Sequence, residues 1–318
     1  MRAWRRLFVG MAWLAGLAVC GVVALVILAP AGPTTPSSDP AKPAWRGFVL
    51  QPPWASPANA PKRASGSCAA RGFDEAAQIN QAGLTTLAWA PFHRAEIGWE
   101  IYAPRIAQEI GAACAPTSSG FAAALARWQS VHGLSANGQM DAATFGVMNT
   151  AWERARPFVR VSETGVCPDA PSDAGLVWAA PEEGYDRKPI QLRPGALAAY
   201  RRMVAAARAG SPAIATDHRL LSIFSGYRSP QADAARCARD GDCGNVTRAL
   251  CSAHRTGLAM DLYLGAAPGR APESSDDVNR LYQSKSPVYT WLVANASRFG
   301  FVNYPFEPWH WEWIGEAQ

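Results

Sequence analysis

The sequence predicts an α+β fold, because helical and strand patterns are mixed along its second half without the strand–helix–strand repeat of a parallel sheet. Pro194 suits the first turn of a helix, and apolar residues follow it at helical spacing: Ala196, Tyr200, Met203 and Ala207. From Leu258 to Leu264, by contrast, apolar residues occupy every second position, as in a strand. We therefore expect a small antiparallel sheet with flanking helices, preceded by a small helical domain and an N-terminal transmembrane helix.

The N-terminus has the features of a membrane anchor. Arg2, Arg5 and Arg6 precede an uncharged stretch from Leu7 to Ala29. As a helix this stretch would be about 34 Å long, enough to cross a hydrocarbon core of about 30 Å. Signal-peptide cores run to only about 7–15 residues, so an uncleaved anchor over residues 1–33 is favoured over a cleaved signal. Positive residues stay in the cytoplasm, so we expect the rest of the chain in the cell envelope, anchored to the inner membrane and extracytoplasmic.

Residues 34–66 are predicted to be a linker, since Pro, Ala and Ser dominate there without a sustained period. Beyond it the chain carries the cysteines Cys68, Cys114, Cys167, Cys237, Cys243 and Cys251. In an oxidising compartment these residues are expected to pair as disulfides, in one of several connectivities. We predict a Cys68–Cys114 bond in the first folded domain and bonds among the other four in the second.

The charge of the chain argues against a nucleic-acid partner. The net charge is +5, and no Lys/Arg-rich run occurs beyond the N-terminus. Such a mildly basic surface remains compatible with an anionic wall polymer as partner. The sequence gives no indication of the oligomeric state.

Residues 67–160 are predicted to form the helical domain. Phe121, Leu125 and Trp128 fall on one stripe of a helix over residues 121–132, and Gly133 can end that helix. Asn137-Gly138 is a turn signal, after which Asp141 can cap a second helix.

This segment resembles the second half of a small three-helix peptidoglycan-binding domain. The resemblance depends on Leu125, Trp128, Gln129, Gly133, Leu134, Asn137, Gly138, Asp141 and Thr144. It implies a domain that binds the wall polymer. Residues 69–115 depart from the pattern, however, and the alternative is a helical packing domain whose aromatic residues form its core.

Residues 175–318 are predicted to form a second domain, after a boundary rich in Pro, Ser and Asp. Its expected elements after the helix at Pro194 are strands over Leu220–Phe224 and Leu258–Leu264, a helix over Val288–Phe299 that ends at Gly300, and a last strand over Trp309–Ile314.

Two residue pairs in this domain have the composition of a metal site. Asp261 follows His254, and Glu307 lies three residues before His310. Each pair alone is weak evidence, because such spacings are common by chance. Together, two imidazoles and one carboxylate suit a tetrahedral zinc with one position open for water. Glu307 would then serve as the base that deprotonates this water.

Two geometric conditions follow from this assignment. Gly257 would have to permit a tight bend between His254 and the strand that carries Asp261. Residues three apart on a regular strand face opposite sides, so Glu307 would have to lie on a bend to share a pocket with His310. An alternative in which Cys251 and His254 hold a structural zinc has less support, because no second Cys/His pair accompanies them.

Three motifs, in this order, resemble the VanY-like D-alanyl-D-alanine carboxypeptidases of the M15 family of zinc peptidases. They are Ser225-Gly226-Tyr227-Arg228-Ser229, Ser252-x-His254-x-x-Gly257-x-Ala259-x-Asp261 and Glu307-Pro308-Trp309-His310-Trp311. The resemblance covers roughly residues 185–315. It implies a small zinc D,D-peptidase fold, a zinc cofactor and peptidoglycan stem peptides as substrate.

The resemblance also implies roles for individual residues. His254, Asp261 and His310 match the zinc ligands, Glu307 the catalytic base, and Arg228 the arginine that stabilises the reacting carbonyl. Substrate contacts are expected from Ser252, Tyr227, Gln231 and Trp309, with Ser252 near the terminal carboxylate; core packing is the alternative role for Trp309.

Related functions stay open at this point. An L,D-carboxypeptidase or an L-alanyl-D-glutamate endopeptidase would use the same residues, because specificity depends on the shape of the pocket. A non-catalytic peptidoglycan-binding protein with a structural zinc is an alternative of another class. Glu307 argues against it, since a structural site needs no base.

Overall fold

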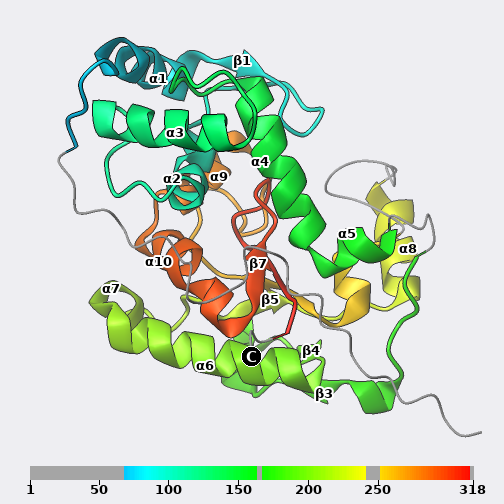
Figure 1. Ribbon diagram of the computed structural model, residues 1–318. Coiled ribbons are helices and arrows are strands. Elements are labelled where there is room, and N and C mark those ends of the chain that lie inside the picture. Colours follow the sequence, from blue (N-terminus) through cyan, green and yellow to red (C-terminus); the bar gives the residue numbers. More distant parts are fainter. Residues whose placement is uncertain (1–67, 163–166, 241–250, 316–318) are drawn as a thin grey trace, which may run out of the picture. The chain divides into compact units, whose positions relative to one another are not determined.

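The computed structural model describes residues 68–162, 167–240 and 251–315 (Figure 1). The predicted anchor over residues 1–33 and the predicted linker over residues 34–66 lie outside this part of the chain. Among the described helices, none has the length and apolar character needed to cross a membrane. All the described residues belong to one compact unit.

Residues 68–162, here called the helical region, contain the helices α1 (Asp74–Thr86), α2 (Ala103–Glu109), α3 (Ser119–Val131), α4 (Ala142–Ala155) and α5 (Pro157–Ser162). Between α1 and α2 lie an antiparallel hairpin and a 3-10 turn: β1 (Ala88–Trp89), β2 (Glu96–Ile97) and η2 (Glu100–Tyr102).

Local signals in the sequence account for several of these boundaries. The predicted helix over residues 121–132 is α3, and Gly133 follows it with φ +70°. Asp141 caps α4 as predicted, because its Oδ1 accepts a hydrogen bond from Thr144 N at 2.7 Å. The predicted Cys68–Cys114 disulfide is present. The core of this region is aromatic, with fully buried Trp99, Tyr102, Phe121 and Phe145.

The second part, residues 167–315, is built around an antiparallel sheet with the strand order β5-β6-β8-β7. Its strands are β5 (Ile223–Ser225), β6 (Ala259–Leu262), β7 (Phe301–Asn303) and β8 (His310–Trp313), and a separate hairpin pairs β3 (Val177–Trp178) with β4 (Gln191–Leu192). The helices are α6 (Pro194–Gly210), α7 (Pro212–Ala215), α8 (Pro230–Asp240), α9 (Asp277–Ser284) and α10 (Pro287–Asn295). Short 3-10 segments are η3 (Asp173–Gly175), η4 (Pro181–Glu183), η5 (Tyr185–Arg187), η6 (Ala253–Thr256) and η7 (Ala296–Phe299).

This mixture of helices and short antiparallel strands agrees with the predicted α+β class. The helix α6 begins at Pro194 as expected, and its buried Ala196, Tyr200 and Met203 share one hydrophobic core with Met260 and Leu262 of β6. The expected strands at residues 258–264 and 309–314 are present but shorter, as β6 and β8, and the strand expected at residues 220–224 is shifted toward the C-terminus, as β5.

The predicted helix over residues 288–299 is divided between α10 and η7, and it ends at Gly300 as expected. Gly300 has φ +78°, and a Cβ there would lie 1.9 Å from the carbonyl oxygen of Gly315. Only glycine fits such a close approach of two backbones. Three helices of this part, α7, α8 and α9, are not among the expected elements. Charged and polar residues dominate α8 and α9, and α7 has only 4 residues.

Candidate metal centre

The pairing of β6 with β8 brings the predicted metal ligands together. In this antiparallel pair Asp261 lies directly opposite His310. His254 lies on η6, immediately before β6. One donor atom from each of the three residues lies within 4.8 Å of the others. All three residues are at most 6% exposed, so the surrounding core holds the donor atoms in place.

Gly257 lets the chain turn from η6 into β6. It has φ +69°, and its N–H donates a hydrogen bond to the carbonyl oxygen of His254 at 3.2 Å. A Cβ at this position would also lie 3.0 Å from Cδ2 of Leu176. The tight bend expected between His254 and Asp261 is therefore present.

Each imidazole presents one nitrogen to the cluster and the other to a hydrogen-bond acceptor. Nε2 of His254 lies 3.1 Å from Asp261 Oδ2, and its Nδ1 lies 2.8 Å from the carbonyl oxygen of Gly226. Nδ1 of His310 lies 2.8 Å from Asp261 Oδ1, and its Nε2 lies 3.4 Å from Glu312 Oε1. Metal-binding histidines are commonly oriented in this way, with the remote N–H donated to a carbonyl or a carboxylate. The donor set thus fits a zinc ion bound by Nε2 of His254, Nδ1 of His310 and the Asp261 carboxylate.

Burial and neighbouring charges shift the pKa values of the cluster in different directions. Burial opposes ionisation of Asp261, but the adjacent His254 and His310 hold its pKa well below the usual range. Burial lowers the pKa of His254. For His310, burial is outweighed by the hydrogen bonds with Asp261 and Glu312, which raise the pKa to about 9. Asp261 is consequently an anion at neutral pH, as a metal ligand must be.

Glu307 lies on the turn between β7 and β8, as the three-residue spacing to His310 requires. Its Oε2 is 4.0 Å from Nδ1 of His310, the nitrogen that faces Asp261. Burial is the main cause that raises the pKa of Glu307 to about 7. A carboxylate with this pKa can both accept and return a proton at neutral pH.

Arg228 lies beside the cluster and is held by two hydrogen bonds. It follows β5, and its Nη2 donates to Ser225 Oγ at 3.0 Å. Its Nη1 donates to Asp233 Oδ1 of α8 at 3.2 Å. Ser252 is joined to the same carboxylate, since its hydroxyl lies 3.0 Å from both oxygens of Asp233. The buried Asp233 therefore holds Arg228 and Ser252 next to each other.

The comparison with known protein families identifies this part of the chain. Residues 189–316 match the family model VanY, which is described as D-alanyl-D-alanine carboxypeptidase. These residues are a VanY domain. No curated protein matches the chain. The VanY domain contains the whole His254, Asp261 and His310 cluster together with Glu307, and at the level of the family it supports carboxypeptidase activity.

The other expected substrate contacts occupy different environments in the VanY domain. Tyr227 is partly buried, and its N–H donates to the carbonyl oxygen of Gln191 at 2.8 Å. Gln231 is exposed near the start of α8. Trp309 is only 2% exposed and belongs to the main hydrophobic core, so its contacts support the packing role. Contact of these residues with substrate stays a prediction.

A second disulfide lies next to the cluster. Cys251 is bonded to Cys167, which makes it unavailable as the structural zinc ligand considered from the sequence. The bond anchors the segment that leads into η6 and His254. Cys237 is buried, and Cys243 lies outside the described residues.

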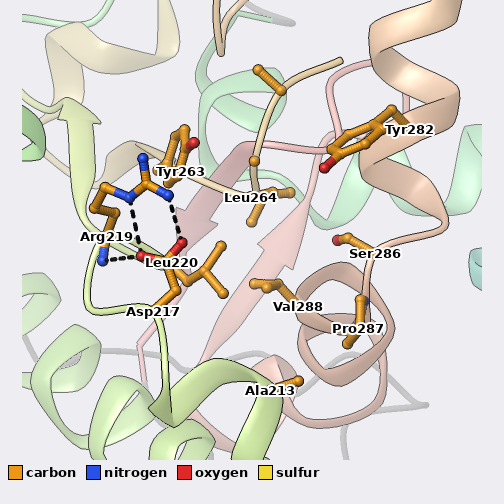
Figure 2. Close-up of a pocket in the computed structure, with 12 residues that line it drawn as sticks. Ala213, Asp217, Arg219, Leu220, Tyr263, Leu264, Tyr282, Ser286, Pro287 and Val288 are labelled. Atoms are coloured by element: carbon orange, nitrogen blue, oxygen red, sulfur yellow. Dashed lines mark hydrogen bonds and ion pairs between the residues drawn. The ribbon is translucent and has the colours of Figure 1, made fainter. Parts of the chain in front are cut away.

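The VanY domain also contains a cavity of about 340 Å³ that is separate from the cluster. It lies between the segment after α7, the end of β6 and the α9–α10 junction (Figure 2). None of the predicted site residues lines it. Its most prominent charge, Arg219, is neutralised by Asp217, with Nη2 at 2.9 Å from Oδ2. The cavity therefore offers no chemistry comparable with that of the metal cluster.

Two acidic residues of the site were not expected from the sequence. Asp233 lies on the unanticipated helix α8, and Glu312 lies two residues after His310 on β8. Both are almost fully buried. The only sequence signal for Glu312 is a charged residue within the alternating aromatic pattern Trp309-x-Trp311-x-Trp313. A charge at a position that burial disfavours indicates a partner inside the fold.

Proposed function

We propose that the chain is a zinc-dependent D-alanyl-D-alanine carboxypeptidase that removes the terminal D-alanine from peptidoglycan stem peptides. The observation that carries this proposal is the His254, Asp261 and His310 cluster with Glu307 beside it, within a VanY domain. Three protein donors leave a fourth position open, which is the arrangement of catalytic zinc sites.

When bound, zinc supplies Lewis-acid chemistry that polarises a carbonyl group and lowers the pKa of water toward about 7. Nε2 of His254, Nδ1 of His310 and the Asp261 carboxylate would hold the ion. The carbonyl oxygen of Gly226 accepts from Nδ1 of His254, which leaves Nε2 of that ring free for the ion. Glu312 would accept from Nε2 of His310 once Nδ1 had given up its proton to bind zinc.

Glu307 is the group that moves the proton. It accepts a proton from the attacking water, whose oxygen forms the new bond to the carbonyl carbon of the scissile peptide. It then returns this proton to the nitrogen of the departing D-alanine as the carbon–nitrogen bond breaks. Burial, which raises the pKa of Glu307 above its usual value, favours acceptance of the proton by this carboxylate.

Arg228 is inferred to stabilise the charge that develops on the carbonyl oxygen. An Arg228→Lys variant is expected to lose about 10²- to 10³-fold in kcat, because a single ammonium cannot replace a planar fork of donors. In the native chain this fork also bonds Ser225 and Asp233. Steady-state kinetics on a stem pentapeptide would measure the loss. Arg219→Lys, in the separate cavity, is the matched control and should retain kcat; equal activity of the two variants would remove Arg228 from the mechanism.

We infer that residues 1–33 anchor the enzyme in the inner membrane and that the catalytic residues act on the extracytoplasmic side. The helical region would bind the wall polymer and so raise the local concentration of stem peptides. Ser252, Tyr227, Gln231 and Trp309 are the inferred substrate contacts.

A set of stem peptides that differ only at the end tests the scissile bond. The full chain with zinc is expected to shorten a pentapeptide that ends in D-Ala-D-Ala and to leave its D-Ala-L-Ala counterpart and the tetrapeptide intact. Shortening of the tetrapeptide would indicate an L,D-carboxypeptidase, and cleavage after the first L-alanine an endopeptidase. Binding to intact sacculi without any cleavage would favour a non-catalytic wall-binding protein.

A further inference from the structure

The turn that carries Glu307 packs into the helical region, which lies outside the VanY domain in sequence. Phe306, immediately before Glu307, is 1% exposed and belongs to the aromatic core of the helical region. Its ring centroid lies 5.3 Å from that of Phe92, and the ring of Tyr304 lies 5.7 Å from the same residue. The base is therefore preceded by a residue that the helical region encloses.

A buried arginine fixes the backbone of the same turn. Arg280 on α9 is fully buried, and its Nε donates to the carbonyl oxygen of Phe306 at 2.8 Å. Its Nη1 donates to Glu96 Oε1 at 2.9 Å, and its Nη2 donates to the hydroxyl of Tyr102. The Tyr102 hydroxyl in turn donates to Glu96 Oε2 at 2.8 Å. Glu96 and Tyr102 of the helical region thus fix the Arg280 guanidinium, which in turn bonds the backbone of the turn.

Separate contacts run from the helical region to His310, the proposed metal ligand. Arg156, at the end of α4, donates from Nε to Glu312 Oε1 at 2.6 Å. The N–H of Phe158 on α5 donates to the other oxygen of Glu312, Oε2, at 3.1 Å. Oε1 of Glu312 lies 3.4 Å from Nε2 of His310. Both oxygens of the carboxylate that orients His310 are therefore bonded to the helical region, whose α4 contacts β7 and whose α5 contacts η6 (Figure 1).

We propose that the helical region is a structural part of the catalytic centre, which positions His310 through Arg156 and Glu312 and positions Glu307 through Glu96, Tyr102 and Arg280. The inference rests on the proposed zinc-peptidase function. The residues that position His310 and Glu307 are not themselves members of the ligand cluster, so their role is one of positioning only. A region that merely tethered the VanY domain to the wall would not need buried charged contacts both with the turn that carries Glu307 and with the carboxylate that orients His310.

The link through Arg156 and Glu312, here called the first link, is tested by zinc affinity, measured without substrate by competition with a chelator. Arg156→Met in the full chain is expected to weaken zinc binding about 10- to 100-fold, as loss of an outer-shell partner commonly does. Glu312→Gln should have a similar effect, and the double variant should be no weaker than the stronger single one, because both changes break the same link. Arg154→Met is the matched control, since Arg154 is exposed on the same helix and should leave the Kd unchanged.

If the Arg156→Met variant does not fold, Arg156→Lys provides the same test. Lysine keeps the buried positive charge but lacks the guanidinium fork that bonds both Glu312 and Glu153. A zinc Kd within two-fold of the parent in folded Arg156 and Glu312 variants would overturn the first link. A parent chain that binds zinc and cleaves no stem peptide would overturn the proposed function and leave the positioning result standing. A parent chain that binds no zinc would overturn both.

The second link, through Glu96, Tyr102 and Arg280, is expected to affect kcat and backbone hydrogen exchange without affecting zinc affinity. Tyr102→Phe removes only the hydroxyl that bonds Arg280 and Glu96, and it should lower kcat about ten-fold through a misplaced Glu307. Zinc affinity should stay unchanged, while backbone amide hydrogen exchange in residues 304–309 should become faster. Tyr282→Phe on α9 is the control, because Tyr282 is 48% exposed. Unchanged kcat and exchange in Tyr102→Phe would overturn this link.

Discussion

A Glu307→Gln variant of the full chain is expected to bind zinc as the parent does and to lose about 10²- to 10⁴-fold in kcat, the range that general acid–base catalysis contributes. Glutamine keeps the size of the side chain, but its amide cannot accept the proton of the attacking water. The three ligand side chains are unchanged, so zinc should remain bound. Metal analysis of the purified variant and steady-state kinetics on a stem pentapeptide would measure the two quantities separately.

Glu273→Gln is the control for this experiment, because Glu273 lies in the same VanY domain and is exposed. It removes the same charge and should leave kcat unaltered. Full activity in a zinc-loaded Glu307→Gln protein would show that another group transfers the proton. The position of Glu307 beside the nitrogen of His310 that faces Asp261 would then need a different explanation.

Removal of zinc is expected to abolish hydrolysis, and addition of about one zinc ion per chain is expected to restore it. Without the metal, Glu307 alone would have to activate water whose pKa is near 16, which a carboxylate with a pKa of about 7 cannot do effectively. The measurement is the rate of product formation before dialysis against a chelator, after it, and after zinc is returned.

His254→Ala provides the matching ligand variant. It should show no recovery on return of stoichiometric zinc, because only Asp261 and His310 would remain as donors. Circular dichroism would verify that the chelated protein stays folded, so that lost activity reports on the metal. Undiminished hydrolysis by chain shown to be free of metal would exclude the zinc mechanism.

The residues of the His254, Asp261 and His310 cluster could be predicted from the sequence because the three motifs that surround them resemble those of the VanY-like carboxypeptidases. Asp261 and His310 come together through the β6–β8 register, and the φ of Gly257 provides the bend that brings His254 to them. The position of Glu307 on a turn was expected because the two-residue period of a strand would otherwise place Glu307 and His310 on opposite faces, whereas the assigned roles require both in one pocket.

The surroundings of the cluster could not be predicted in the same way. Arg156 is 156 residues from Glu312, and Glu96 is 184 residues from Arg280. No local periodicity encodes contacts over such separations; they depend on how α4, η2 and α9 pack in three dimensions. Asp233 was missed for a related reason, since α8 has little apolar pattern to mark it as a helix.

The domain boundaries at residues 67–160 and 175–318 remain a prediction from composition. The two predicted domains nevertheless share buried contacts. Phe306 belongs to the core of the helical region, and Arg280 is hydrogen-bonded to Glu96 of that region. Extensive buried contact of this kind is typical of parts that fold together. The order of segments along the sequence gives no indication that the two predicted domains share these buried contacts.

The most direct test of the account is mass spectrometry of the products that the zinc-loaded full chain forms from a stem pentapeptide ending in D-Ala-D-Ala. The expected products are the tetrapeptide and free D-alanine. An uncleaved pentapeptide in the presence of bound zinc, or fragments from a bond deeper in the stem, would contradict this expectation.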